Sequence, residues 1–276
     1  MIKDILVNLS AYAKRDAVVD YAASLAAMFE AHLSGVAFAY EPVVAASAMG
    51  GAPIDFIDAQ RAENRRICET AAKAFNEAAS RAGAAAESHV FALGVAAAAD
   101  QFGQMARRHD LSVLMQAGGD DDSAGGDMII EAALFQSGRP ILVVPYIQKG
   151  GVTLDRVMVC WDGGRTAARA IGDAMPILRK AKSVSLVMAT GEEGKRDVVP
   201  GADMAHHLAR HGVNVEVQRI VVEGNVHGAL LSHAADISAD FMVMGGFGHS
   251  RLREFILGGV TRAMLRSMAV PCLMSH

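Results

Sequence analysis

This sequence has few cysteines, no long apolar run and no large excess of one charge. Each of these features argues against a class of protein. The three cysteines, Cys68, Cys160 and Cys272, lie far apart and form no C-x-x-C pair, so neither a disulfide framework nor a zinc ribbon is indicated. We interpret them as buried thiols in a reducing compartment. No run approaches the roughly eighteen uninterrupted apolar residues of a membrane-spanning helix, so no membrane partner is expected.

The charge balance argues against polyanionic partners. Lysine and arginine number 26 against 30 aspartates and glutamates, for a formal net charge of −4, so neither nucleic acid nor an anionic membrane is expected. The first residues, Met1 to Ile5, place an acid before a strand-length apolar run and do not read as a signal peptide. We therefore expect a cytoplasmic protein. Its 276 residues are enough for about two domains of ordinary size.

Short apolar runs alternate with stretches of helical periodicity along the whole chain. This alternation predicts parallel, doubly wound α/β sheets with helices on both faces. The predicted strands of the first half are Ile5–Leu9, His32–Tyr40, Ser88–Ala92, Leu111–Met115 and Ile141–Pro145, and those of the second half begin at Asp155, Val184, Val215, Phe241 and Val270. A long helix is predicted over Ile54–Arg81, and residues 41–53 lose periodicity and are predicted to form a loop.

The second half of the chain repeats the first. Gly224 and Asp240 follow Gly94 and Asp110 at the same interval of 130 residues, and Asp162 takes the place of Ser10 after the first strand of each half. We therefore predict two tandem units of one α/β type, with domains at residues 1–147 and 155–276 and a five-stranded, mostly parallel sheet in each.

A glycine-rich segment follows the apolar run that ends at Met244. Gly245 and Gly248 allow a sharp turn and close approach to a ligand, and Gly258-Gly259 opens a predicted helix. Free N–H groups at a helix N-terminus behind a glycine loop bind anions, usually phosphate. A tight strand-to-helix connection is the structural alternative.

This loop resembles the nucleotide loop of the universal stress proteins, G-x2-G-x9-G-(S/T). Gly245, Gly248 and Gly258 match the spacing, whereas Gly259 stands in the Ser/Thr position and the nearest hydroxyl is that of Thr261. The resemblance implies a Rossmann-like fold, a loop that wraps the ribose and phosphates of ATP, and an Asp after the first strand that meets the nucleoside. The implied site residues are Asp162, Ala189, Met244, Gly245, Gly248, His249, Gly258, Gly259, Val260 and Thr261.

The ligand is left open among three nucleotides. Gly259 offers no hydroxyl to a terminal phosphate, so ADP and AMP stand beside ATP, with Mg²⁺ as an accompanying cation. Asp162 considered alone would read as a helix cap.

The corresponding loop of the first half carries different chemistry. Only Gly118 of the motif glycines survives there, and four carboxylates, at Asp120, Asp121, Asp122 and Asp127, would repel a polyphosphate. We therefore predict that the first unit does not bind nucleotide in the family's way. A cation-binding loop and a solvated charged loop are the two interpretations of these acids.

Other motifs fail on spacing. Gly191 to Arg196 is not a phosphate-binding P-loop, and Gly248-His249-Ser250 lacks the closing glycine of a nucleophile elbow. His207 and His211 have a spacing that can hold zinc, although surface histidines on a helix are commoner. We assign no catalytic residue and no metal ligand, and expect at most slow ATP hydrolysis.

These observations favour an adenine-nucleotide-binding stress-response protein that acts as a nucleotide-dependent binding module. The alternative is a protein or small-metabolite binding module that no longer uses nucleotide. The resemblance also implies that the last strands of the two units, Ile141–Val144 and Cys272–Met274, pair within the chain as an internal pseudo-dimer. The sequence does not decide whether two chains form a further homodimer, and it does not identify a protein partner.

Overall fold

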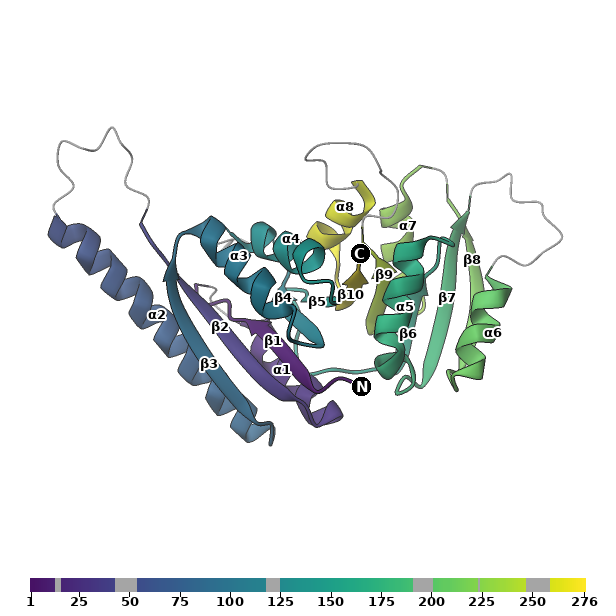
Figure 1. The fold of residues 1–276 in the computed structure, drawn as a ribbon. Helices are drawn as coiled ribbons and strands as arrows, with labels where there is room; N and C mark the ends of the chain where they lie inside the picture. The colour runs from purple at the N-terminus through teal and green to yellow at the C-terminus, as the bar shows by residue number, and fades with distance from the viewer. Residues whose placement is uncertain (13–15, 43–53, 118–124, 191–200, 223, 247–258) are drawn as a thin grey trace. The chain divides into compact units, whose positions relative to one another are not determined.

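The computed structural model describes residues 1–12, 16–42, 54–117, 125–190, 201–222, 224–246 and 259–276. The predicted 41–53 loop, beyond its first two residues, and Asp120–Asp122 lie outside these ranges. Contacts divide the chain into an N-terminal unit of residues 2–137 and 149–151, and a C-terminal unit of Met1, 138–148 and 152–276. Each unit alternates strands with helices, as Figure 1 shows.

The N-terminal unit is a parallel sheet with the strand order β3-β2-β1-β4. Helix α1 packs against α2, and α3 packs against α4. The elements, in chain order, are β1 (Asp4–Asn8), α1 (Ala17–Phe29), β2 (His32–Tyr40), α2 (Ile54–Arg81), β3 (Ala86–Leu93), α3 (Val95–Ala106), β4 (Leu111–Met115) and α4 (Gly126–Gln136).

The core of this unit lies between the sheet and its helices. Ile5, Leu33 and Leu111 come from three adjacent strands and are at most 1% exposed, as central strands covered on both faces require. Phe75 of α2 lies against Gly35 of β2, where a Cβ atom would come within 2.6 Å of the phenyl ring. This glycine lets the long helix pack closely on the sheet.

The C-terminal unit has the strand order β5-β10-β9-β6-β7-β8. All described pairings in it are parallel except that of β5 with β10. Its elements are β5 (Ile141–Val144), β6 (Arg156–Cys160), α5 (Arg165–Leu178), β7 (Ser183–Thr190), α6 (Ala202–Arg210), β8 (Val215–Val221), α7 (Val226–Asp236), β9 (Phe241–Gly245), α8 (Gly259–Ser267) and β10 (Cys272–Ser275).

The antiparallel partner of β10 comes from the end of the first sequence repeat. Val143 pairs with Cys272, and Ile141 with Met274, which confirms the predicted pairing of these two strands. The α/β class and the mostly parallel sheets are also confirmed. Because β5 groups with β10, the described strands number four in the N-terminal unit and six in the C-terminal one.

The repeat is visible in matching hydrogen bonds. Asp110 Oδ2 accepts bonds from the backbone N–H groups of Lys3 at 2.8 Å and Asp4 at 3.2 Å. Asp240 accepts the corresponding bonds with its two oxygens, Oδ2 from the Asp155 N–H at 2.7 Å and Oδ1 from the Arg156 N–H at 3.2 Å. In each sequence repeat, an aspartate just before the fourth strand thus fixes the beginning of the first strand. Among the described residues, each helix is too short or too polar to cross a bilayer.

Candidate functional site

The C-terminal unit has a topological switch point between β6 and β9. These strands are parallel neighbours, with Val157 opposite Phe241 and Val159 opposite Val243. The chain continues from β6 to β7 on one side and from β9 to β10 on the other. Open α/β sheets bind ligands outside the carboxyl ends of the two strands that flank such a point. The residues that follow Cys160 and Met244 therefore occupy the expected place for a ligand.

Asp162 lies at this edge, two residues after β6, and its side chain is exposed. Its Oδ1 atom accepts a hydrogen bond from the N–H of Gly164 at 2.7 Å. Gly164 precedes the first residue of α5 and supplies no capping side chain itself. The carboxylate therefore orders the turn into α5, and its residue is exposed at this edge of the sheet.

Gly245 ends β9 directly beside that turn. A Cβ atom there would come within 2.6 Å of both the Ala167 nitrogen and the Thr166 Oγ1, so the first turn of α5 packs against this glycine. Met244, one residue earlier, is 5% exposed and forms part of the core. The sequence pattern assigned Gly245 to a ligand loop, and its packing role was missed because only the fold brings α5 to it.

The other predicted site residues come from two further elements. Ala189 is half-buried near the end of β7, the strand beside β6. Helix α8 begins at Gly259, so the predicted Gly-to-helix step is present. Val260 is 39% exposed, whereas Thr261 is 4% exposed. The burial of Thr261 makes its hydroxyl a poor substitute for the Ser or Thr that Gly259 replaces.

Gly248, His249 and Gly258 lie outside the described residues, so their positions are not part of the geometry above. A residue that the sequence did not indicate lies where this loop begins. The Nδ1 atom of His276, which follows β10, is 3.2 Å from the Gly246 carbonyl oxygen. No sequence pattern marks this residue, because only the pairing of β9 with β10 brings the two together.

The two thiols near this edge have raised pKa values. Burial, assisted by the nearby Asp162 carboxylate, raises the pKa of the Cys160 thiol to about 12. Burial and the neighbouring Cys160 raise the pKa of Cys272 well above its ordinary value. A protonated thiol is a weak nucleophile and a poor metal ligand.

Metal binding finds no further support among the described residues, where no group of three or more His, Cys, Asp or Glu side chains converges. His207 and His211, the pair whose spacing could hold zinc, stack edge to face with ring centroids 4.6 Å apart. The Arg179 guanidinium donates to Nδ1 of His211 at 3.1 Å, which engages this ring in a contact with a cation.

The corresponding edge of the N-terminal unit is occupied by aromatic side chains. Tyr12, just after β1, stacks on Tyr40 at the end of β2 with ring centroids 5.9 Å apart. The Tyr12 hydroxyl accepts a hydrogen bond from the Tyr40 N–H at 3.3 Å and lies 3.8 Å from the Cys68 thiol. Burial raises the pKa of Tyr40 to about 12. Sequence reasoning noted the loss of glycines here but not these rings.

Ser10, the counterpart of Asp162, is tied into a local cap. Its N–H donates to Asp16 Oδ2 at 2.8 Å, and Val18 N–H donates to Oδ1 of the same carboxylate at 3.0 Å. Burial raises the pKa of Asp16, although the backbone N–H groups bonded to it act in the opposite direction. This carboxylate starts α1 rather than facing a ligand.

Comparison with known proteins agrees with this architecture. The universal stress protein family matches residues 153–276. The universal stress protein Slr1230 of Synechocystis is 26% identical over 140 residues, which are 49% of this chain and 46% of that protein. The match thus spans about half the length of this curated relative.

Solved structures resemble nearly the whole chain in fold. A universal stress protein from Archaeoglobus fulgidus has a TM-score of 0.74 at 19% identity, and the similarity covers 99% of this chain and 97% of that one. A functionally unknown protein from Pseudomonas aeruginosa has a TM-score of 0.60 at 14% identity, covering 99% and 92%. At these identities the likeness concerns the fold. Together with the family match, it confirms the resemblance found in the sequence: residues 153–276 of this chain form a domain of the universal stress protein family.

Proposed function

We propose that the protein binds an adenine nucleotide at the carboxyl ends of β6 and β9 and acts in a stress response as a nucleotide-dependent binding module. The ligand is ATP, ADP or AMP, with Mg²⁺ accompanying the phosphates. We also propose that the protein is cytoplasmic and consists of domains 1–147 and 155–276, of which only the second binds nucleotide.

One observation carries the proposal. An exposed carboxylate, that of Asp162, and a glycine, Gly245, lie at the carboxyl ends of the two parallel strands that flank the switch point. Asp162 can accept hydrogen bonds from nucleoside hydroxyl or amino groups, and its bond to Gly164 fixes its position. Gly245 begins the glycine segment that ends where α8 starts, at Gly259. The first N–H groups of a helix lack intrahelical partners and favour phosphate.

The contrast between the units supports use of one site only. In the N-terminal unit, the stacked Tyr12 and Tyr40 rings lie at the edge beyond β1 and β2. A Cβ atom on Gly125, the residue before α4, would come within 3.0 Å of the Tyr40 hydroxyl. A nucleotide would have to displace these rings.

Isothermal titration of the full chain, freed of copurified nucleotide, with ATP, ADP and AMP tests the proposal. Each titration is run with Mg²⁺ and with a chelator. We expect binding of at least one nucleotide, and no heat with any of the three would overturn the proposal. Gly248→Val should abolish binding while the fold persists, because a branched side chain would obstruct the loop.

Two substitutions at Asp162 separate its roles. Asp162→Asn keeps an oxygen for the Gly164 N–H but loses the charge, whereas Asp162→Ala loses both. We expect both to weaken nucleotide affinity about tenfold or more, since hydrogen bonds to charged groups contribute about 1.5–3 kcal/mol. Only Asp162→Ala should lower the free energy of unfolding, by about 1 kcal/mol. Unchanged affinity in both variants would leave Asp162 a structural residue.

A binding module without nucleotide is the second candidate. Two contacts favour it: the packing of α5 is sufficient reason for a glycine at position 245, and the hydrogen bond to Gly164 is sufficient reason for an aspartate at position 162. The same titrations decide between the two.

A further inference from the structure

Strand β3 is the last strand in the order of the N-terminal sheet, and its outer backbone edge faces away from β2. The Leu33 N–H bonds to the Ala85 carbonyl oxygen and the Glu41 N–H to that of Leu93, so the odd-numbered residues of this segment face β2. Because backbone groups alternate along a strand, the N–H and C=O groups of Ser88 and Val90 point outward. An eight-residue edge of this kind is a template for pairing with another strand.

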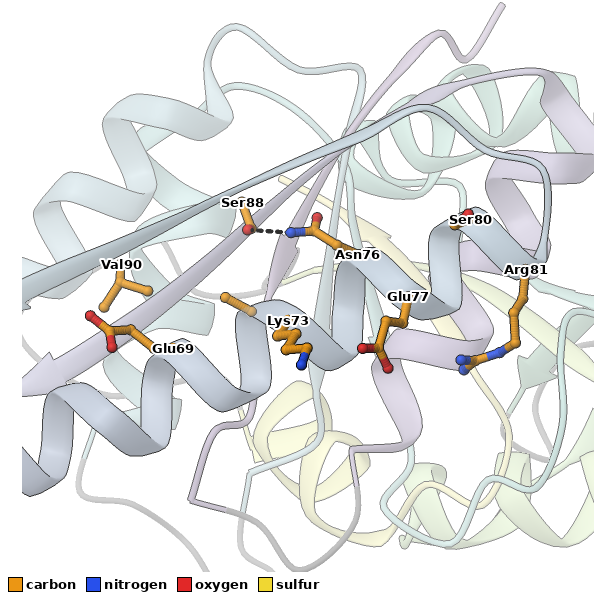
Figure 2. A pocket seen from close by; sticks show the side chains of 9 residues that line it. Glu69, Lys73, Asn76, Glu77, Ser80, Arg81, Ser88 and Val90 are labelled. Carbon is orange, nitrogen blue, oxygen red and sulfur yellow. Dashed lines mark hydrogen bonds between the residues drawn. The ribbon is translucent and has the colours of Figure 1, made fainter.

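A row of alternating charges runs along α2 beside this edge. Glu69, Lys73, Glu77 and Arg81 are spaced four residues apart, so they share one face of the helix. Figure 2 shows them in a line along α2. Together with Ser88 and Val90 they line an open hollow of about 760 Å³ between helix and strand. All four side chains belong to exposed residues.

One hydrogen bond sets the alignment of α2 against β3. Asn76 Nδ2 donates to Ser88 Oγ at 2.9 Å, the dashed line in Figure 2. The helix runs antiparallel to the strand after the turn at Gly83. The midpoint of the charge row, between Lys73 and Glu77, therefore lies beside Ser88.

We propose that β3 pairs antiparallel with β3 of a second copy of this chain, about a two-fold axis that passes near Ser88. In such an isologous contact, every pair of residues occurs twice. The axis places Lys73 of each copy opposite Glu77 of the other, and Glu69 opposite Arg81. In this reversed orientation the charge row is thus complementary to itself.

The strand is complementary about the same axis. With Ser88 opposite its own copy, Glu87 stands opposite His89, on the face of the sheet away from the charge row. These side chains are 57% and 44% exposed and lie 3.7 Å apart within one chain. The axis derived from the helix charges and the axis derived from the strand coincide, although the two sets of residues are independent.

The spacing of the elements permits the contact. Neighbouring strands lie about 4.8 Å apart, and α2 packs on both β2 and β3. Two copies of α2 related by this axis would lie about 10 Å apart, a usual separation for packed helices. The edge strand of the C-terminal unit, β8, is accompanied by α6, which spans nine residues and carries Asp203 and His207 at the equivalent spacing, with His211 directly after its last residue. Such a row does not complement itself.

A charge-swap cycle on the full chain tests the dimer by sedimentation equilibrium across a wide range of protein concentrations at low salt. We expect a monomer–dimer equilibrium that added salt weakens. Lys73→Glu and Glu77→Lys should each weaken association about tenfold, because two attractive pairs become repulsive. The double variant restores opposite charges and should return to within about threefold of the parent. Arg61→Glu, which makes the same charge change as Lys73→Glu on the same helix, is the control and should have no effect.

Three outcomes would overturn the proposal. The first is a parent chain that stays monomeric at every concentration. The second is a double variant no better than the single ones, because this would show that Lys73 and Glu77 do not face each other across the axis. The third is assembly beyond the dimer through this edge, as head-to-tail pairing of β3 with β8 would give. Circular dichroism of each variant verifies that the fold is retained.

Discussion

At Gly245 a single added methyl group would meet the backbone of α5. The nearest atoms, the Ala167 nitrogen and the Thr166 Oγ1, lie 2.6 Å from the position of a Cβ atom. Backbone at such a distance cannot rotate away as a flexible side chain can. This residue therefore supports the site by packing, whatever the loop after it binds.

Gly245→Ala should lower the free energy of unfolding by about 2 kcal/mol or more, because α5 must move away from β9. Gly172→Ala is the matched control in α5 itself: this exposed helical glycine has nothing within 4 Å of its Cβ position. The control should raise stability by up to about 1 kcal/mol. Urea unfolding of the parent and the two variants measures both effects. If Gly245→Ala were as stable as the parent, α5 could move away from β9 at no cost in free energy.

Cys160 should make the free energy of unfolding fall as the pH rises into the alkaline range. Its pKa is raised to about 12 by burial and then by Asp162, whereas an unfolded thiol titrates near 8.5. Above about pH 9 the unfolded chain loses this proton and the folded chain keeps it, so stability is complete below that pH and declines as the pH rises. The loss is at most about 1.4 kcal/mol per pH unit.

Cys160→Ala should therefore flatten the fall in unfolding free energy between about pH 9 and 11, even though it costs some packing at neutral pH. Denaturant titrations at a series of pH values give the two slopes. Parallel slopes for parent and variant would show that this thiol does not contribute.

At the scale of elements, α2 has two parts with different burial. Between Asp55 and Arg66 most residues are exposed, whereas Cys68, Phe75 and Ala79 of the second part are at most 1% exposed. Asn64 holds the first part through a 2.7 Å hydrogen bond from its Nδ2 atom to the Tyr40 carbonyl oxygen. Few apolar contacts therefore oppose local opening there.

Hydrogen exchange should detect this difference within one helix. We expect amides of residues 55–66 to exchange at least about tenfold faster than those of 68–79, because local opening costs less where little apolar surface is exposed by it. Asn64→Ala should increase this difference in exchange rate, because it removes the hydrogen bond that holds the first part of α2 to Tyr40. Uniform protection along α2 would contradict the argument.

The order and type of the elements could be predicted because apolar periodicity is local. The strands Leu111–Met115 and His32–Tyr40 were predicted with their observed bounds. The Tyr12–Tyr40 stack and the contact of Gly245 with α5 could not be predicted, since they join residues that only the topology brings together. The site residues Gly248, His249 and Gly258 stay predictions from the motif.

At the scale of the molecule, the two sequence repeats and the two compact units do not share a boundary. Residues 138–148 end the first repeat, yet they group with the C-terminal unit, where β5 pairs with β10. All four residues of β5 are fully buried. The second repeat alone would leave Cys272, Leu273 and Met274 with an unpaired edge.

A chain of residues 138–276 should therefore unfold at a higher urea concentration than one of residues 155–276, by about 2 kcal/mol or more in free energy of unfolding. Leu142→Asp in the longer chain should remove most of this gain, because Leu142 stands opposite Leu273 and a charge there would be buried without a partner. The shorter chain should also self-associate as its concentration rises, since an open apolar edge pairs with its own kind. Equal stability of the two chains would mean that β10 does not depend on β5, and that the second repeat is complete by itself.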